Sequence, residues 1–168
     1  MNNENKTNIN WYPGHMAKTK REITENLKLI DVVIELLDSR IPISSRNPDI
    51  AEITKNKKKI IVLNKIDLAD EKQNNLWVQY FKQRGQVAIL TDSNQGKGMD
   101  LVIKAIENIM DEEIKAQSEK GRIGKKIRVM ILGIPNVGKS SFINRIVKSN
   151  RLEVGNKPGV TKRKQWIS

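Results

Sequence analysis

The amino-acid sequence predicts an α/β fold in which a mainly parallel sheet carries helices on its faces. Three observations predict it: short apolar runs alternate with segments of helical periodicity, polar loops follow the apolar runs, and one loop contains two glycines before a lysine. Strands buried on both faces read as nearly continuous apolar runs. The carboxyl ends of such strands meet at one edge of the sheet, where open α/β sheets bind ligands.

The apolar runs and the helical spacings place the elements in order. The expected strands are residues 31–37, 60–63, 87–90 and 127–132. Apolar residues at helical spacing predict helices around Ile23, Leu27 and Ile30, over residues 76–84, from Met99 to Met110, and from Lys139 to about Lys148. Residues 115–126 are polar and basic and predict an exposed connector.

Length and composition bound the class of protein. A chain of 168 residues is the size of one ordinary domain, so residues 1–168 are expected to fold as one unit. The chain has no cysteine, which excludes disulfides and thiolate metal sites and fits a reducing cytoplasm. Its first ten residues are polar, and no apolar run approaches a membrane span. The formal net charge of +12 favours a polyanionic partner, or reflects a lysine-rich proteome.

Residues 133–140 have the form G-x-x-x-x-G-K-[ST] of a phosphate loop. Backbone N–H groups of such a loop face an anion, Lys139 reaches the β and γ phosphates, and Ser140 supplies a hydroxyl to Mg²⁺. The expected nucleotide-binding residues here are Gly133, Pro135, Asn136, Val137, Gly138, Lys139, Ser140 and Ser141. The alternative is a strand-to-helix turn that binds nothing.

The second chemical motif, N-K-x-D, spans Asn64, Lys65 and Asp67 after an apolar strand. The Asp67 carboxylate can accept from the ring N–H and the exocyclic amine of guanine, a pair that adenine does not offer. Ser93 and Asn94 follow the next strand and are expected to approach the guanine oxygen. Helix-capping and turn roles are the alternatives for these loops.

The N-K-x-D motif precedes the phosphate loop, whereas most GTPases have the opposite order. Finding both motifs intact but reversed indicates a circular permutation, with the motif order G4-G5-G1-G2.

Five segments in this order resemble the ribosome biogenesis GTPase A (YlqF) family of circularly permuted GTPases. They are residues 11–18, 38–42 together with 44–48, 64–67, 133–141 and 158–161. The resemblance implies a Ras-like P-loop GTPase domain, GTP hydrolysis with Mg²⁺, and assistance to the assembly of the large (50S) ribosomal subunit. Expected partners are that subunit and its rRNA, without DNA or membrane, in the cytoplasm.

The resemblance also implies roles for three further residues. Thr161 would be the switch-one threonine that joins Ser140 on Mg²⁺, and Asn136 would help to hold K⁺ against the phosphates. His15 would orient the attacking water. The alternatives are a flexible basic loop for Thr161 and a turn or packing role for His15.

Basic residues form candidate contacts to rRNA, although a solvated face explains any one cluster equally well. They are Lys18, Lys20, Arg21, Arg40, Arg46, Lys120, Arg122, Lys125, Lys126 and Arg128.

The resembled family continues past Thr161 to a D-x-P-G switch-two segment and a helical RNA-binding domain. We therefore expect residues 1–168 to be a G domain that is incomplete at its carboxyl end, with strand 127–132 as an exposed edge and residues 162–168 without a proper neighbour. Such a piece is expected to bind nucleotide weakly, hydrolyse it poorly and aggregate. Two other functions stay open: a non-catalytic GTP-dependent RNA-binding module or inactive fragment, and a GTPase that acts on another RNA or on the small subunit.

Overall fold

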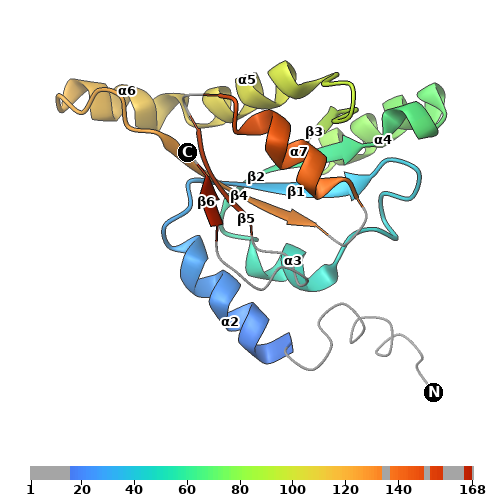
Figure 1. The fold of residues 1–168 in the computed structure, drawn as a ribbon, viewed down its shortest axis with the longest axis horizontal. Coiled ribbons are helices and arrows are strands. Elements are labelled where there is room, and N and C mark those ends of the chain that lie inside the picture. Colours follow the sequence, from blue (N-terminus) through green and yellow to red (C-terminus); the bar gives the residue numbers. More distant parts are fainter. Residues whose placement is uncertain (1–15, 134–136, 150–151, 157–164, 168) are drawn as a thin grey trace.

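The structure, a computed structural model, describes residues 16–133, 137–149, 152–156 and 165–167 (Figure 1). Its helices are α2 (Met16–Leu27), α3 (Pro48–Ile53), the 3-10 helix η1 (Ile66–Leu68), α4 (Glu71–Gln83), α5 (Met99–Ile109), α6 (Asp111–Glu119) and α7 (Lys139–Ile146). Its strands are β1 (Val32–Asp38), β2 (Lys58–Asn64), β3 (Val87–Leu90), β4 (Ile127–Gly133), β5 (Leu152–Asn156) and β6 (Gln165–Ile167).

The strands form one sheet in the order β3-β2-β1-β4-β5-β6. The first five strands run parallel, and β6 pairs antiparallel with β5. The register brings the ends of neighbouring strands together, since Asp38 lies opposite Asn64 and Leu36 lies opposite Gly133. The predicted α/β fold is confirmed, and the loops that follow β1, β2, β3 and β4 share one edge of the sheet.

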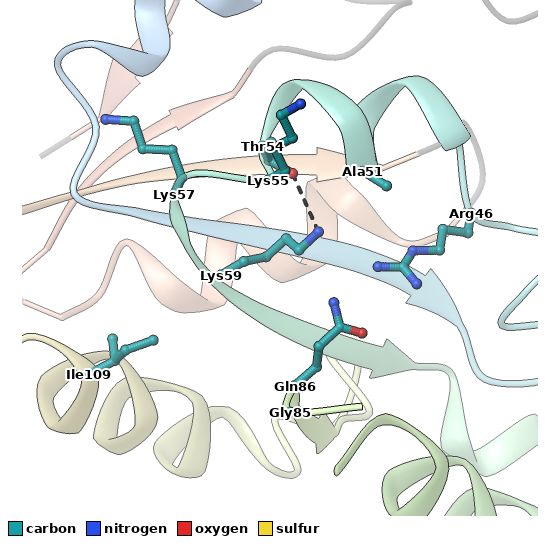
Figure 2. A pocket seen from close by; sticks show the side chains of 9 residues that line it. All are labelled: Arg46, Ala51, Thr54, Lys55, Lys57, Lys59, Gly85, Gln86 and Ile109. Atoms are coloured by element: carbon teal, nitrogen blue, oxygen red, sulfur yellow. Dashed lines mark hydrogen bonds between the residues drawn. The ribbon is translucent and has the colours of Figure 1, made fainter. Parts of the chain in front are cut away.

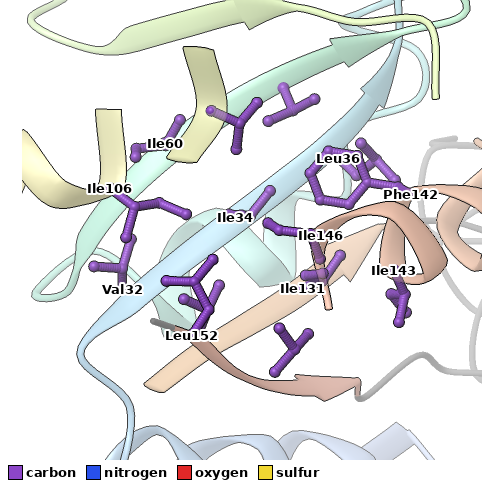
Figure 3. Packing of buried hydrophobic residues seen from close by; sticks show 14 of the residues in the cluster. Val32, Ile34, Leu36, Ile60, Ile106, Ile131, Phe142, Ile143, Ile146 and Leu152 are labelled. Carbon is purple, nitrogen blue, oxygen red and sulfur yellow. The ribbon is translucent and has the colours of Figure 1, made fainter. Parts of the chain in front are cut away.

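Helices cover both faces of the sheet. In Figure 1, α5, α6 and α7 lie on one side and α2 and α3 lie on the other. Alternate residues of β1 serve the two faces: Ile34 and Leu36 pack with Ile106 of α5 and Phe142 of α7 (Figure 3), whereas Val33 packs in the cluster of α2 and α3. Fully burying one such side chain contributes roughly 1.5–3 kcal/mol, so these two apolar layers fix the orientation of each strand.

Two helices differ from the sequence prediction because capping set their limits. Helix α4 begins at Glu71 rather than near residue 76, since the Asp70 side chain accepts a hydrogen bond from the Gln73 backbone N–H. Helix α3 was not predicted. It has only 6 residues, too few to show a periodic pattern, and it starts where Asn47 caps the chain before Pro48.

The predicted exposed edge at residues 127–132 is wrong. Strand β5 pairs in parallel with β4, and Leu152 and Val154 are buried in the core between the sheet and α7. Residues 165–167 have a neighbour as well, because β6 pairs with β5. Because β4 is paired with β5, the reason given for expecting aggregation, an exposed β4 edge, does not apply. The short alternation of Leu152, Glu153 and Val154 carried too weak a strand signal to be recognised.

The predicted connector over residues 115–126 is helical in its first part. Helix α6 spans Asp111–Glu119, and it begins with the acidic residues Asp111, Glu112 and Glu113, which favour a helix N-terminus. None of its residues is buried. The segment is exposed as expected, but its backbone follows directly from α5 as a second helix.

Candidate nucleotide-binding site

The phosphate loop joins β4 to α7 at the carboxyl edge of the sheet. Gly138 precedes α7 with φ of 85°, a conformation that favours glycine. A Cβ atom at Gly138 would lie 2.5 Å from Asn64 Nδ2, and one at Gly133 would lie 2.8 Å from the Leu36 carbonyl oxygen. Both glycines are needed because the loop packs directly on neighbouring strands.

Lys139 is the first residue of α7, and its side chain turns back over the loop. Its Nζ lies 3.4 Å from the Gly133 carbonyl oxygen. Among the described residues, no carboxylate lies within ion-pair distance of this ammonium, and burial lowers its pKa to about 8. A partly desolvated cation without an acidic partner fits a site that receives phosphate.

Asn64, at the end of β2, connects three loops. Its amide Nδ2 donates to the Val137 carbonyl oxygen at 2.9 Å and to Ser93 Oγ at 3.0 Å. Its Oδ1 accepts from Thr91 Oγ1 at 3.0 Å and from the Ser93 backbone N–H at 3.1 Å. The side chain is almost fully buried, with 1% exposed. The N-K-x-D loop, the phosphate loop and the loop after β3 are thus held in one arrangement.

Lys65 and Asp67 continue the N-K-x-D motif at the surface of the same edge. Lys65 has φ of 63°, the single positive value among the described non-glycine residues. Such strain concentrates at functional sites. Its Nζ lies 4.0 Å from Asp38 Oδ2. Asp67 is exposed in η1, so a ligand can reach its carboxylate from solvent.

Asp38 and Arg40 form a paired group beside this loop. Arg40 donates to both carboxylate oxygens of Asp38, at 3.0 Å from Nε and 2.7 Å from Nη2. This hydrogen bonding lowers the pKa of Asp38, although burial opposes the shift. The pKa of Arg40 is raised, first by its bond to Asp38 and least by the charge of Asp67. Arg40 therefore pairs with Asp38 beside the N-K-x-D loop, and this ion pair accounts for its position without the predicted rRNA contact.

Arg145 was not predicted as a site residue. It lies on α7 and crosses to the loop after β3, where Nε donates to the Ser93 carbonyl oxygen at 3.1 Å and Nη2 donates to the Asn94 carbonyl oxygen at 2.6 Å. Asp92 Oδ1 accepts from the Asn94 backbone N–H at 3.1 Å and bends the same loop. Arg145 fixes this loop to the helix that begins at the phosphate loop. A basic residue six positions after Lys139 carries no signal of such a contact in the sequence.

Several predicted site residues lie outside the described residues. They are His15, Pro135, Asn136 and Thr161. Ser140 and Ser141 lie in the first turn of α7, beside Lys139. Among the described residues there is no group of three or more metal-ligating side chains that could hold an ion on its own.

The basic residues predicted to meet rRNA fall into two kinds. Lys20, Arg40, Arg46 and Arg128 form ion pairs with Asp49, Asp38, Glu35 and Glu153. Arg21, Lys120, Arg122, Lys125 and Lys126 are exposed. The side chain of Lys18 lies outside the described residues. Most of the exposed basic residues in this set therefore lie at or just after the carboxyl end of α6.

Known proteins resemble this chain over most of its length. Ribosome biogenesis GTPase A of Bacillus cereus is 48% identical over 159 residues, which cover 95% of this chain and 54% of that protein. The chain belongs to the ribosome biogenesis GTPase A family. The family member of Thermotoga maritima is 36% identical over 162 residues, covering 95% of this chain and 54% of that protein. A protein family described as 50S ribosome-binding GTPase matches residues 128–168.

A solved structure supports the same family assignment. The crystal structure of GNP-bound YlqF from T. maritima superposes with a TM-score of 0.60 and 29% identity, covering 82% of this chain and 55% of that one. The predicted resemblance to ribosome biogenesis GTPase A is confirmed, and so is the GTPase fold. The chain spans about half the length of the curated relatives it matches. Within the part described, no helix combines the length and apolar character that a membrane span requires.

Proposed function

We propose that this chain is the nucleotide-binding part of a GTP-hydrolysing assembly factor that docks on the maturing large ribosomal subunit in the cytoplasm. The hydrogen-bond network of Asn64 carries the proposal, because it joins the phosphate loop to both loops expected to read the base. The names of the relatives agree with it, since they are called ribosome biogenesis GTPases. In this proposal GTP promotes docking and hydrolysis times release.

Recognition of guanine rests on the surface of the N-K-x-D loop. The exposed Asp67 carboxylate would accept two hydrogen bonds from the base, and the methylene stem of Lys65 would lie along its plane. The loop at Ser93 and Asn94 would lie beside the guanine oxygen, while the backbone N–H groups of these two residues donate to Asn64 Oδ1 and Asp92 Oδ1. The bonds from Asn64 and Arg145 hold that loop in place before the ligand arrives, which lowers the ordering cost of binding.

The triphosphate would lie over the loop from Gly133 to Lys139. The Lys139 ammonium, which lacks a described acidic partner, would neutralise phosphate charge. Ser140 and Thr161 would hold Mg²⁺, and Asn136 would hold K⁺. These cations would supply positive charge where negative charge develops on the phosphate oxygens during phosphoryl transfer. His15 is our candidate for orienting the attacking water.

Calorimetry with GTP, ATP and XTP tests the nucleotide assignment. The parent chain should bind GTP and not ATP. Asp67→Asn should weaken GTP binding at least tenfold and favour XTP, because the amide replaces one acceptor by a donor. Asp70→Asn is the matched control: it removes the same charge three residues away, and asparagine caps a helix as well as aspartate. Equal binding of ATP and GTP by the parent would refute the assignment.

Two further measurements test the enzyme and its partner. Single-turnover hydrolysis with and without large subunits separates a GTPase from a module that only binds GTP. Comparing K⁺ with Na⁺ in the same assay tests the role given to Asn136, and His15→Ala tests the role given to the histidine. Sedimentation with 50S and 30S particles should show GTP-dependent binding to 50S alone. Equal association with both particles would contradict the proposed partner.

A further inference from the structure

A polar cavity lies beside β2, with most of its lining at the amino-terminal end of that strand and with Arg46 contributed by the loop after β1. It has a volume of about 460 Å³ and lies where β2 begins, between α3, the turn after α4 and the end of α5 (Figure 2). Lys59 lines it, and Asn64 stands five positions further along β2. At about 3.3 Å per residue, the cavity is roughly 15–20 Å from the Asn64 network. The end of the cavity at Lys59 is therefore separate from the nucleotide site.

Cationic side chains dominate the walls of this cavity. Arg46, Lys55, Lys57 and Lys59 all line it. Two of them share one carboxylate: buried Glu35, with 1% of its side chain exposed, lies 2.8 Å from Arg46 Nε and 3.2 Å from Lys59 Nζ. Glu35 carries one negative charge and the two basic side chains carry two positive charges, so one positive charge remains uncompensated.

The rim adds further positive charge. Lys55 pairs with exposed Glu52, an ion pair of small worth in water. Lys57 donates to the Ile30 carbonyl oxygen at 3.2 Å, and no described carboxylate lies within ion-pair distance of it. Four cationic residues thus line one cavity, and two carboxylates, Glu35 and Glu52, pair with three of them. The site favours an anion and disfavours a cation or an apolar ligand.

Hydrogen-bond donors converge inside the cavity. In Figure 2 the side chains of Arg46, Lys59 and Gln86 point toward one another from three different segments of the chain. The bonds of Arg46 to Glu35 use Nε and Nη2, so three of its five N–H groups remain. The Gln86 amide makes no side-chain hydrogen bond with the described residues. A guanidinium, an ammonium and an amide that meet in this way match the several acceptor oxygens of one phosphate.

We propose that this cavity binds a phosphate group of an RNA backbone. The buried Glu35 holds Arg46 and Lys59 in position without cancelling both charges, so the site is formed before the anion arrives. A phosphodiester brings a single negative charge together with acceptor oxygens, and the formal net charge of +12 draws such a polyanion to the chain. The choice of RNA as the source of the phosphate rests on the proposed function.

The test introduces a carboxylate into the cavity and keeps Glu35, Arg46 and Lys59 in place. Gln86→Glu should pair with Arg46 and Lys59 and exclude phosphate. Gln83→Glu is the matched control, since this exposed residue of α4 gives the same charge change outside the cavity. We expect Gln86→Glu to weaken binding of a large-subunit rRNA fragment about tenfold and to reduce the slope of log K against log salt by roughly 0.7–0.9, with little change for Gln83→Glu.

Three outcomes would overturn the proposal. Equal weakening by both variants would show a general charge effect. Shifts of the Lys59 and Gln86 amide resonances with inorganic phosphate as strong as those with RNA would show that RNA is not the specific source. Failure of the parent chain to bind the rRNA fragment would rule out RNA as the partner of this cavity. Calorimetry with GTP on the same samples keeps the two proposals apart, because Gln86→Glu leaves the nucleotide loops unchanged.

Discussion

Replacing Asn64 by alanine tests whether one side chain holds the nucleotide loops together. The change deletes four hydrogen bonds, to Thr91, to Val137 and two to Ser93, in a position that is 1% exposed. A net contribution of about 1 kcal/mol per bond predicts a loss of about 4 kcal/mol in the free energy of unfolding. Urea denaturation should show this loss as a lower midpoint at an unchanged m value.

Asn74→Ala provides the control for this prediction. Asn74 is also a buried asparagine, but its side chain donates one long hydrogen bond, 3.4 Å to the Ile66 carbonyl oxygen, and its Oδ1 has no partner in the described part of the chain. Its replacement should cost about 1 kcal/mol. If both substitutions lowered stability equally, the reasoning from the network would be refuted.

Asn64→Asp tests the hydrogen bond from Asn64 to the phosphate loop. The carboxylate can still accept from Thr91 and Ser93, but it cannot donate to the Val137 carbonyl oxygen of the phosphate loop. The carboxylate is also a buried charge beside that carbonyl oxygen. We therefore expect a loss of stability at least as large as for alanine, together with at least a tenfold loss of GTP affinity by calorimetry. GTP binding as tight as that of the parent would show that the bond to Val137 does not position the loop.

Three further predictions concern other parts of the site. Arg145→Met should weaken GTP binding about fivefold to tenfold, because the loop after β3 loses two charge-assisted bonds; calorimetry measures the change, and an unaltered affinity would rule out this positioning role. Burial lowers the pKa of Lys139 from 10.5 to about 8. Between these two pH values the unfolded nucleotide-free chain binds more protons than the folded chain, so the free energy of unfolding rises with pH. Phosphate beside Lys139 should restore its proton, so GTP affinity should fall above pH 8, and calorimetry in two buffers should detect proton uptake that Lys139→Met lacks. Gly98→Ala should destabilise the chain by about 2–4 kcal/mol in thermal unfolding, since φ there is 82° and a Cβ would overlap the Leu90 carbonyl oxygen, whereas Gly85→Ala meets open space and should cost less.

Local patterns in the sequence carried most of the fold. The apolar runs that became β1, β2 and β4 were recognisable because both faces of these strands are largely buried, and the carboxyl ends of β2 and β4 placed Asn64 and Gly133 at one edge. The phosphate loop and the N-K-x-D motif were recognisable because their chemistry requires particular residues at particular spacings. Strand β5 escaped this reasoning, since its few residues gain their strand character mainly from pairing with β4.

The sequence by itself determined the class of sheet, the two nucleotide motifs and their permuted order. Only the tertiary structure decided which distant side chains meet, as when Arg145 reaches the carbonyl oxygen of Ser93 or when Glu35, inside an apolar strand, pairs with Arg46 and Lys59. The reason is physical. Periodicity and capping depend on neighbours within a few residues along the chain, whereas hydrogen bonds and ion pairs depend on distances that exist only after the sheet has brought separate segments together.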